Sequence, residues 1–259
     1  MMQIRRPWST AHKPKIVDLT GFTGVAYAIG DVHGCLDLLR GLEAKIAKDA
    51  QQYQCDVVVI YLGDMIDRGP DSFGVIEYLM SAPPPRLKRI CLMGNHEDQM
   101  LHFLRKPAST PEWLDFGGVE TLVSYGAPVR SICGSTLKGR KIGFLLERII
   151  PKEHMEFLKN LPQAVEMKDY FLSHAGINPA KKLRKQTYRD LVWGTEAFFR
   201  IPQRYEKLIV FGHNITAFAH RKKGLVAVDT GAYSSGKLSA VKLVQDFEVE
   251  FLAFIHNDR

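Results

Sequence analysis

Short apolar runs alternate with segments of helical periodicity along most of this chain. Each run is rich in Val, Ile, Leu or Tyr, has the length of a strand, and ends at a glycine or serine. The runs that we expect to form strands are residues 25–29, 56–62, 89–93, 170–172 and 208–211.

Apolar residues spaced three or four apart predict amphipathic helices between these runs. The helical segments are 35–47, 72–80, 98–105 and 152–160. Strands that alternate with helices favour an α/β fold with a largely parallel sheet covered by helices. Near the carboxyl end, the pattern predicts three antiparallel strands at 225–229, 238–244 and 248–254.

Two stretches lack this periodicity. Residues 1–23 contain prolines and a glycine and predict a loosely ordered N-terminal arm. Residues from about 107 to 148 are crowded with glycine and predict a cap-like insert. We expect one domain over residues 24–259, because a chain of 259 residues suffices for one large α/β unit.

The composition is that of an ordinary globular protein, with 46% hydrophobic and 24% charged residues. No apolar stretch approaches the roughly 20 residues that span a bilayer, so we expect no membrane partner. The net charge of +7 favours anionic partners. No nucleic-acid module accompanies the basic runs, so we interpret 181–185 and 221–223 as solvated surface and do not expect nucleic acid as a partner.

Cysteine usage and the amino terminus predict a cytoplasmic location. The four cysteines show no CxxC spacing, and we expect them to be reduced and buried. The first residues lack the apolar region of a secretory signal.

The turn after each predicted strand carries side chains that bind metals. In an open α/β sheet the loops beyond the carboxyl ends of the strands converge on one crevice, so we expect these side chains to form one site. The candidate metal ligands are Asp31, His33, Asp64, Asn95, His174 and His213.

This set suits two divalent ions that lie about 3.5 to 4 Å apart and activate a bridging water. Asp64 is our candidate for the carboxylate that both ions share. The remaining ligands divide so that the first ion takes Asp31 and His33 and the second takes Asn95, His174 and His213. Oxygen and imidazole donors favour manganese, with iron or zinc as alternatives, over calcium.

Three further residues fit phosphoryl chemistry. His96 is placed to protonate the leaving group, Asp67 to orient its ring, and Arg68 to clamp phosphate oxygens. Taken singly, each site residue also fits a structural role, such as an Asx turn, a hydrogen-bonded histidine or a local ion pair. The joint pattern over five strand ends favours the metal site.

Three of these turns carry a family signature. In order, they read Gly-Asp-Val-His-Gly at 30–34, Gly-Asp-Met-Ile-Asp-Arg-Gly at 63–69 and Gly-Asn-His-Glu at 94–97. The chain resembles the phosphoprotein phosphatase group of the calcineurin-like metallophosphoesterases from about residue 24 to 254. The resemblance implies a four-layer α/β/β/α sandwich, a dinuclear metal site at the carboxyl ends of the strands, and the ligand and catalytic roles given above.

Two other segments, 113–118 and 229–238, resemble small bacterial serine/threonine phosphatases and diadenosine tetraphosphatase-like members. We expect Trp113 to pack within the insert and Asp229 to cap a bend.

The chain departs from the family pattern at two positions, neither of which removes a metal ligand, and the first bears on the choice of substrate. Family members usually carry an arginine at the position of Thr195, and Arg189 and Arg200 are the nearby candidates to replace it. A threonine is also common where Asn214 follows the last predicted ligand.

We therefore predict a metal-dependent phosphoester hydrolase that acts on a phosphorylated protein or nucleotide. Our first hypothesis is a serine/threonine protein phosphatase. The alternative is a hydrolase of dinucleoside polyphosphates such as diadenosine tetraphosphate. From another class, a catalytically weak phosphate-binding or scaffold protein would retain the fold without turnover.

Overall fold

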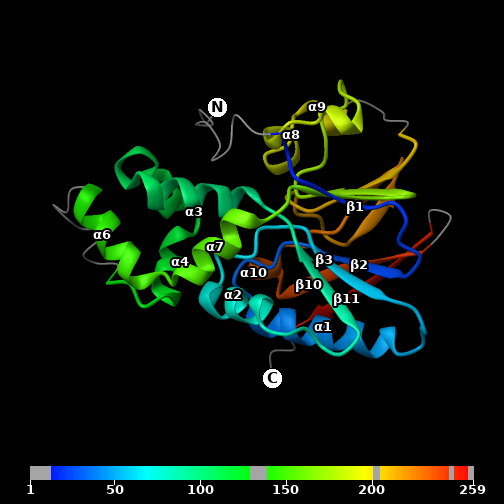
Figure 1. The fold of residues 1–259 in the computed structure, drawn as a ribbon, viewed down its shortest axis with the longest axis horizontal. Helices are drawn as coiled ribbons and strands as arrows, with labels where there is room; N and C mark the ends of the chain where they lie inside the picture. Colours follow the sequence, from blue (N-terminus) through cyan, green and yellow to red (C-terminus); the bar gives the residue numbers. More distant parts are fainter. Residues whose placement is uncertain (1–12, 129–138, 201–204, 245–247, 256–259) are drawn as a thin grey trace.

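The computed structural model describes residues 13–128, 139–200, 205–244 and 248–255. Two sheets stack face to face, and helices cover their outer faces (Figure 1). The six-stranded sheet has the order β1-β5-β6-β7-β9-β8, and the five-stranded sheet has the order β11-β10-β2-β3-β4. The strands are β1 (Ile16–Leu19), β2 (Val25–Ile29), β3 (Val57–Tyr61), β4 (Leu87–Cys91), β5 (Ala164–Met167), β6 (Tyr170–Ser173), β7 (Leu208–Phe211), β8 (His220–Lys222), β9 (Leu225–Ala227), β10 (Lys237–Leu243) and β11 (Val249–Ile255).

Helices connect these strands. The α-helices are α1 (Leu36–Ala50), α2 (Ser72–Met80), α3 (Asn95–Arg105), α4 (Gly118–Ser124), α6 (Gly139–Ile149), α7 (Lys152–Asn160), α8 (Tyr188–Val192), α9 (Ala197–Arg200) and α10 (Ala232–Ser235). The 3-10 helices are η1 (Pro107–Ser109), η2 (Pro111–Phe116) and η3 (Leu183–Lys185).

Strand β2 shows why the central strands read as continuous apolar runs. Its small residues Ala26 and Ala28 face the second sheet, where they pack in the core between the two sheets. Tyr27 and Ile29 face the opposite way, into the core beneath the helices. Both faces of β2 are therefore buried, and the apolar–polar alternation of a one-sided sheet is absent.

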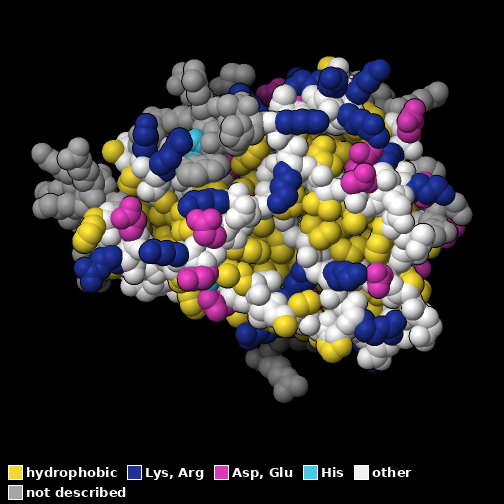
Figure 2. Space-filling model, viewed as in Figure 1, with side chains coloured by type: hydrophobic (Ala, Val, Ile, Leu, Met, Phe, Trp, Pro, Cys, Tyr) yellow, Lys and Arg dark blue, Asp and Glu magenta, His cyan; other side chains and the backbone are white. Residues whose placement is uncertain are grey.

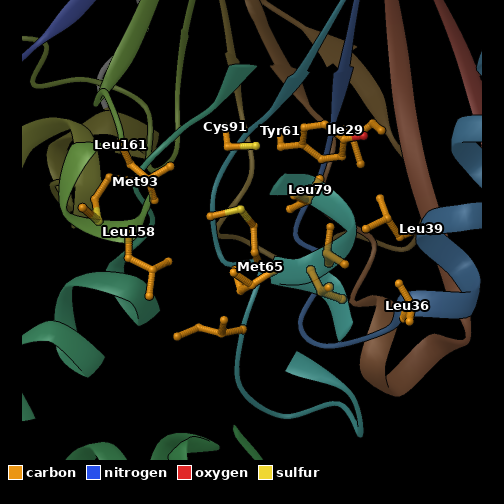
Figure 3. Packing of buried hydrophobic residues seen from close by; sticks show 14 of the residues in the cluster. Ile29, Leu36, Leu39, Tyr61, Met65, Leu79, Cys91, Met93, Leu158 and Leu161 are labelled. Atoms are coloured by element: carbon orange, nitrogen blue, oxygen red, sulfur yellow. The ribbon is translucent and has the colours of Figure 1, made fainter. Parts of the chain in front are cut away.

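The helices on the five-stranded sheet pack through apolar side chains. Leu36 and Leu39 of α1 and Leu79 of α2 lie against Ile29 and Tyr61 of the sheet (Figure 3). The same cluster continues past β4 to the helical part of the molecule through Met93, Leu158 and Leu161.

The six-stranded sheet has its own outer core. Phe171 and Ile209 of this sheet pack with Leu191 of α8 and Phe198 of α9. The order of layers is therefore helix, sheet, sheet, helix. The expected four-layer α/β/β/α fold is confirmed.

The expected insert is helical over its described residues. It forms η1, η2, α4 and α6, and these lie with α3 and α7 at one end of the molecule (Figure 1). Helix α4 packs on α2, and α6 packs on α3. Gly117, with φ 106°, ends η2 and starts α4 in a left-handed conformation. A glycine at such a junction interrupts the helical periodicity, so the sequence pattern does not predict the short helices on either side of it.

Several predicted boundaries need correction. Residues 16–19 of the expected arm form β1, which pairs in parallel with β5 and belongs to the six-stranded sheet. Strand β4 begins two residues before its predicted start, and α3 begins at Asn95 rather than at 98. Short polar and apolar motifs do not fix the ends of an element, because pairing and capping partners decide them.

The three closing strands do not form one antiparallel set. Strands β10 and β11 are antiparallel neighbours, as predicted. Strand β9 lies in the other sheet, parallel to β7 and antiparallel to β8. An alternating pattern reports burial on one face and carries no information on which sheet receives the strand.

Cysteine burial varies more than predicted. Cys91 is buried, Cys35 is half-buried and Cys55 is exposed, whereas Cys133 lies outside the described residues. Cys55 follows the polar turn after α1, before β3 enters the core. Within the described part of the chain, no helix combines the length and apolar character needed to cross a membrane.

Candidate metal and phosphate site

The predicted ligands come from the carboxyl ends of strands in both sheets. Asp31 follows β2, Asp64 follows β3, His174 follows β6 and His213 follows β7, while Asn95 opens α3. Because the two sheets stack with these ends at one edge, residues up to 182 positions apart meet. The backbone N–H of His213 donates to both carboxylate oxygens of Asp31, at 3.2 and 2.9 Å.

Asp64 lies at the centre of the cluster. Its Oδ2 is 3.7 Å from His33 Nε2, 3.8 Å from His96 Nε2 and 3.4 Å from His174 Nε2. These residues and His213 form two overlapping groups of potential metal-binding atoms that share Asp64. The structure thus places three of the predicted ligands, His33, His174 and His213, around Asp64, together with His96, which the sequence predicted as the acid. Of the other two predicted ligands, Asp31 accepts the backbone N–H of His213, and Asn95 lies beside His174 and His213.

The donor atoms fit a divalent cation. The Nδ1 of His174 lies 3.0 Å from the carbonyl of Leu62, and donation there leaves a lone pair on Nε2. That Nε2 faces Asn95 Oδ1 at 2.8 Å, and His213 Nδ1 lies 2.8 Å from the same oxygen. A metal ion among these three atoms would be bound by one amide oxygen and two imidazole nitrogens, each through a lone pair.

The histidines are held in the form that binds metal. Burial lowers the pKa of His33 to about 4, and burial together with the neighbouring His174 lowers the pKa of His213 to about 4. Burial likewise lowers the pKa of His174. The His33 ring is further oriented by Nδ1, 2.9 Å from the carbonyl of Ile66. Neutral imidazoles are ready to coordinate without first losing a proton.

Buried carboxyl groups concentrate negative charge here. Burial, followed by the charges of Asp229 and Asp64, raises the pKa of Asp31 well above its ordinary value. Burial raises the pKa of Asp229 to about 6, although its hydrogen bond from Gly231 opposes the shift. For Asp64, burial raises the pKa, but the surrounding histidines outweigh burial and hold it below its ordinary value. Cations bound between these groups would offset their repulsion.

The site is built on backbone conformations that few side chains adopt. Among the described residues, seven non-glycine residues have positive φ, and five of them belong to the site. Those five are His33 (45°), Asp64 (51°), Asp67 (70°), Arg68 (70°) and His213 (63°). Such backbone strain persists only where the surrounding structure imposes it. Here the five strained residues belong to the loops that form the cluster around Asp64.

Glycines make room for the ligands. A Cβ at Gly212 would lie 2.1 Å from Asp31 Oδ1, and a Cβ at Gly94 would lie 2.2 Å from Asp64 Oδ1. Neither distance is possible without moving the carboxylate. These glycines therefore do more than permit turns.

Glu97 also belongs to the site, although it is not among the predicted site residues. Its buried carboxylate accepts the backbone N–H groups of Asp64, Met65 and Gly94, at 2.9, 2.7 and 2.9 Å. Burial, with a smaller effect of Asp64, raises the pKa of Glu97 to about 8. Glu97 thus ties the loop after β3 to the start of α3. Two sequence signals mark Glu97: it ends the Gly-Asn-His-Glu motif at 94–97, and it is the acidic third residue of α3, as in a capping box.

His96 and Asp67 form a buried pair beside the metal cluster. His96 Nδ1 lies 2.7 Å from Asp67 Oδ2. Burial lowers the pKa of His96, but the charge of Asp64 and the hydrogen bond to Asp67 outweigh burial and raise it to about 9. Trp113 Nε1 donates to Asp67 Oδ2 at 2.8 Å, and the hydroxyl of Thr121 donates to Oδ1 at 2.6 Å. Trp113 therefore does more than pack, because the insert supplies two donors to this carboxylate.

Arg68 lies at the mouth of the site. Its guanidinium is exposed and lies 5.4 Å from the centre of the Tyr233 ring. Tyr233 also meets His33 edge to face, with ring centres 5.2 Å apart. Tyr233 lies in the segment 229–238 but is not among the predicted site residues.

The position of Thr195 does not recruit another arginine. The Thr195 hydroxyl is buried and has no hydrogen-bond partner among the described residues. Arg189 is exposed, and exposed Arg200 pairs with Glu196 at 3.1 Å. No described contact joins either guanidinium to the predicted ligands.

The family model for calcineurin-like phosphoesterases matches residues 26–217, which contain all the predicted ligands. The chain belongs to this family. It is a metal-dependent phosphoester hydrolase, and the members of the family use divalent metals.

Curated relatives of this family member include bis(5'-nucleosyl)-tetraphosphatases. The symmetrical enzyme of Methylobacillus flagellatus is 28% identical over 84% of this chain and 91% of its own length. The asymmetrical enzyme PrpE of Oceanobacillus iheyensis is 24% identical over 83% of this chain and 86% of its own length. A symmetrical enzyme of Serratia proteamaculans is 43% identical, but the match spans only 79 residues, 30% of this chain and 24% of that protein.

Solved structures agree on the fold. A protein described as a diadenosine tetraphosphatase superposes with a TM-score of 0.63 at 19% identity, covering 95% of this chain and all of the other. A cold-active protein-tyrosine phosphatase from a psychrophilic Shewanella gives a TM-score of 0.55 at 16% identity, covering 92% of this chain and 82% of the other.

Proposed function

We propose that this phosphoesterase hydrolyses a phosphoanhydride bond of dinucleoside polyphosphates such as diadenosine tetraphosphate. The observation that carries the proposal is that two tetraphosphatases align with more than four-fifths of the chain and of their own length. This substrate replaces phosphoserine and phosphothreonine proteins as our preferred choice. The likeness to a protein-tyrosine phosphatase is a likeness of fold only.

Two divalent metals would be held by the residues that converge on Asp64. Asp31 and His33 would complete one site, and the second would take Asn95, His174 and His213. A pair of ions in such a site supplies an activated water and neutralises charge on the phosphoryl group. Manganese remains our prediction for both ions, as does a cytoplasmic location for the protein.

The side chains of this chain would carry out the remaining steps. The planar fork of Arg68 reaches from the rim to bind phosphate oxygens. Tyr233 limits the directions in which that fork can turn. His96, oriented by Asp67, would give the proton on Nε2 to the leaving oxygen.

The raised pKa of His96, about 9, provides a protonated acid at neutral pH. A cation bound at Asp64 would cancel part of the charge that raises it. The working pKa should therefore lie below 9 and closer to neutrality.

Competing substrates test the proposal. Manganese-loaded protein should hydrolyse diadenosine tetraphosphate with a kcat/KM at least about 100-fold above that for phosphoserine and phosphothreonine peptides, a transition-state difference of about 2.7 kcal/mol. An Asp64→Asn variant provides the background. A preference for phosphopeptides would restore the protein phosphatase hypothesis and refute this proposal.

Product analysis separates the two modes represented among the relatives. Symmetrical cleavage of diadenosine tetraphosphate gives two molecules of ADP, whereas asymmetrical cleavage gives AMP and ATP. Because one relative of each kind aligns over most of the chain, both outcomes are compatible with the proposed substrate.

A further inference from the structure

A cavity of about 360 Å³ lies next to the loop that carries His213. It is formed by α9, by β7, β8 and β9 at the edge of the six-stranded sheet, and by the start of the loop after β7. This volume is at the lower end of the range for small-molecule pockets. The cavity can therefore hold one small ligand, such as a nucleoside.

One wall of the cavity is aromatic. Phe198, Phe199 and Phe211 pack together, with ring centres 4.9, 5.0 and 5.8 Å apart. Phe198 and Phe211 are buried, but Phe199 is 53% exposed. The Phe199 ring thus packs against two buried phenylalanines and remains partly exposed. Any nucleobase can stack on such an aromatic ring.

A polar side chain beside the cavity has a buried amide nitrogen without a partner among the described residues. The side chain of Asn214 lines the cavity, and its buried Nδ2 has no hydrogen-bond acceptor among the described residues. A buried donor without an acceptor is unfavourable, and a ligand acceptor would satisfy it once the amide turns toward the cavity.

The remaining wall is basic. Arg200, Lys222 and Lys223 line the cavity. The sequence alone predicts solvated surface at residues 221–223. In the fold, both lysines of this run line the cavity. Figure 2 shows Lys and Arg side chains crowded at the end of the molecule that carries α8 and α9. Such a field attracts a polyphosphate.

The cavity adjoins the candidate metal site. Asn214 lines the cavity, and the preceding residue, His213, places Nδ1 2.8 Å from Asn95 Oδ1. Consecutive Cα atoms lie about 3.8 Å apart, so the loop that lines the cavity with Asn214 also carries a predicted metal ligand. The aromatic wall and the basic wall therefore lie beside the loop that presents His213.

We propose that this cavity binds one nucleoside of a dinucleoside polyphosphate, with its base against Phe199 and its phosphate chain directed along the basic wall to His213. The inference rests on the proposed function for its substrate. It adds the location of the nucleoside.

The deciding experiment uses AMP and inorganic phosphate as inhibitors of p-nitrophenyl phosphate hydrolysis by the metal-loaded full chain. Both inhibitors carry a phosphate, but only AMP carries a nucleoside. In the wild-type protein the inhibition constant of AMP should be about tenfold lower than that of phosphate. The free energy that corresponds to this factor lies within the range for stacking one base on an aromatic side chain. Phe199→Ala should remove this advantage, and Phe199→Trp should retain it.

A matched control is Phe251→Ala, which removes an exposed phenylalanine (40% exposed) from the edge strand β11 of the other sheet. It should keep the tenfold advantage of AMP. Thermal unfolding of each variant verifies that its fold is retained. On diadenosine tetraphosphate, Phe199→Ala should raise KM about tenfold.

The possible results separate the two proposals. If AMP inhibits no better than phosphate, or if Phe199→Ala keeps the advantage, the cavity is not a nucleoside site. If the wild-type protein hydrolyses p-nitrophenyl phosphate but leaves diadenosine tetraphosphate intact, the proposed function is wrong, and the AMP comparison still decides whether the cavity binds a nucleoside.

Discussion

At the scale of single residues, the site depends on backbone positions that tolerate little change. Asp64, Asp67 and His213 adopt left-handed conformations, with φ of 51°, 70° and 63°. Gly212 leaves space in which the Asp31 carboxylate accepts the N–H of His213 at 2.9 Å. The candidate ligands could be predicted from the sequence. The close packing of the glycine backbone against the ligand carboxylates could not, because it arises between loops far apart in the chain.

Gly212→Ala tests this crowding. The new Cβ would lie 2.1 Å from Asp31 Oδ1 and would displace the carboxylate. We expect metal affinity and kcat to fall roughly 10- to 100-fold, as when a supporting partner of a metal ligand is lost. Gly21→Ala, where a Cβ meets nothing within 4 Å, is the control and should match the wild type. Equal metal affinities, measured by calorimetry, would show that Asp31 is not a ligand.

His96→Asn tests the assignment of the acid. A general acid contributes most when the leaving group is strongly basic, by about 10²- to 10⁴-fold. The variant should therefore lose at least about 100-fold in kcat on phenyl phosphate and much less on p-nitrophenyl phosphate, whose leaving group needs no proton. An equal loss on both esters would mean that His96 does not protonate the leaving group.

At the scale of elements, the sequence predicted most strands and helices around the site and failed where long-range contacts decide. Helix α2 has its predicted bounds because Asp71 caps it locally, accepting the N–H of Gly74 at 2.8 Å. Strand β1 was missed because only its pairing with β5 makes it a strand. Likewise, the hydrogen bond from Trp113 to Asp67 joins residues 46 positions apart, which no local pattern reveals.

The insert should affect catalysis through Asp67. Thr121→Val and Trp113→Phe each remove one donor from this fully buried carboxylate, and each should lower the free energy of unfolding by about 1–3 kcal/mol. Both variants should also lose more activity on phenyl phosphate than on p-nitrophenyl phosphate, because His96 is less well oriented. Thr121→Ser keeps the hydroxyl and serves as the control. If both esters respond equally, the insert acts on stability alone.

At the scale of the whole molecule, two sheets bring carboxylates and histidines from loops far apart in the sequence into one buried cluster. The sequence could predict that these loops converge, because parallel strands share one carboxyl edge. It could not predict the electrostatic balance, in which Glu97 and His96 have pKa values raised to about 8 and about 9.

This balance predicts how metal-free protein responds to pH. Between pH 6.5 and 9 the folded state binds more protons than the unfolded state, at Glu97 (raised from 4.5 to about 8) and at His96 (raised from 6.5 to about 9). The free energy of unfolding should therefore fall as pH rises through this window. Below pH 6.5, His33 and His213, whose pKa values are lowered to about 4, oppose the trend.

Thermal unfolding in EDTA and in manganese would show the effect. The metal-free protein should lose stability between pH 6.5 and 9. In manganese, the bound cations balance the negative charge in place of protons, so the unfolding temperature should depend less on pH. A metal-free curve that rises over this window would contradict the charge assignments.

The central claim is that the strand-end loops of both sheets form one two-metal site around Asp64. Calorimetric titration of manganese into metal-free protein tests it most directly. The wild type should bind two ions per chain, and Asp64→Asn should weaken both sites together because they share this carboxylate. An Asp64→Asn protein that still binds two ions with wild-type affinity would contradict the claim.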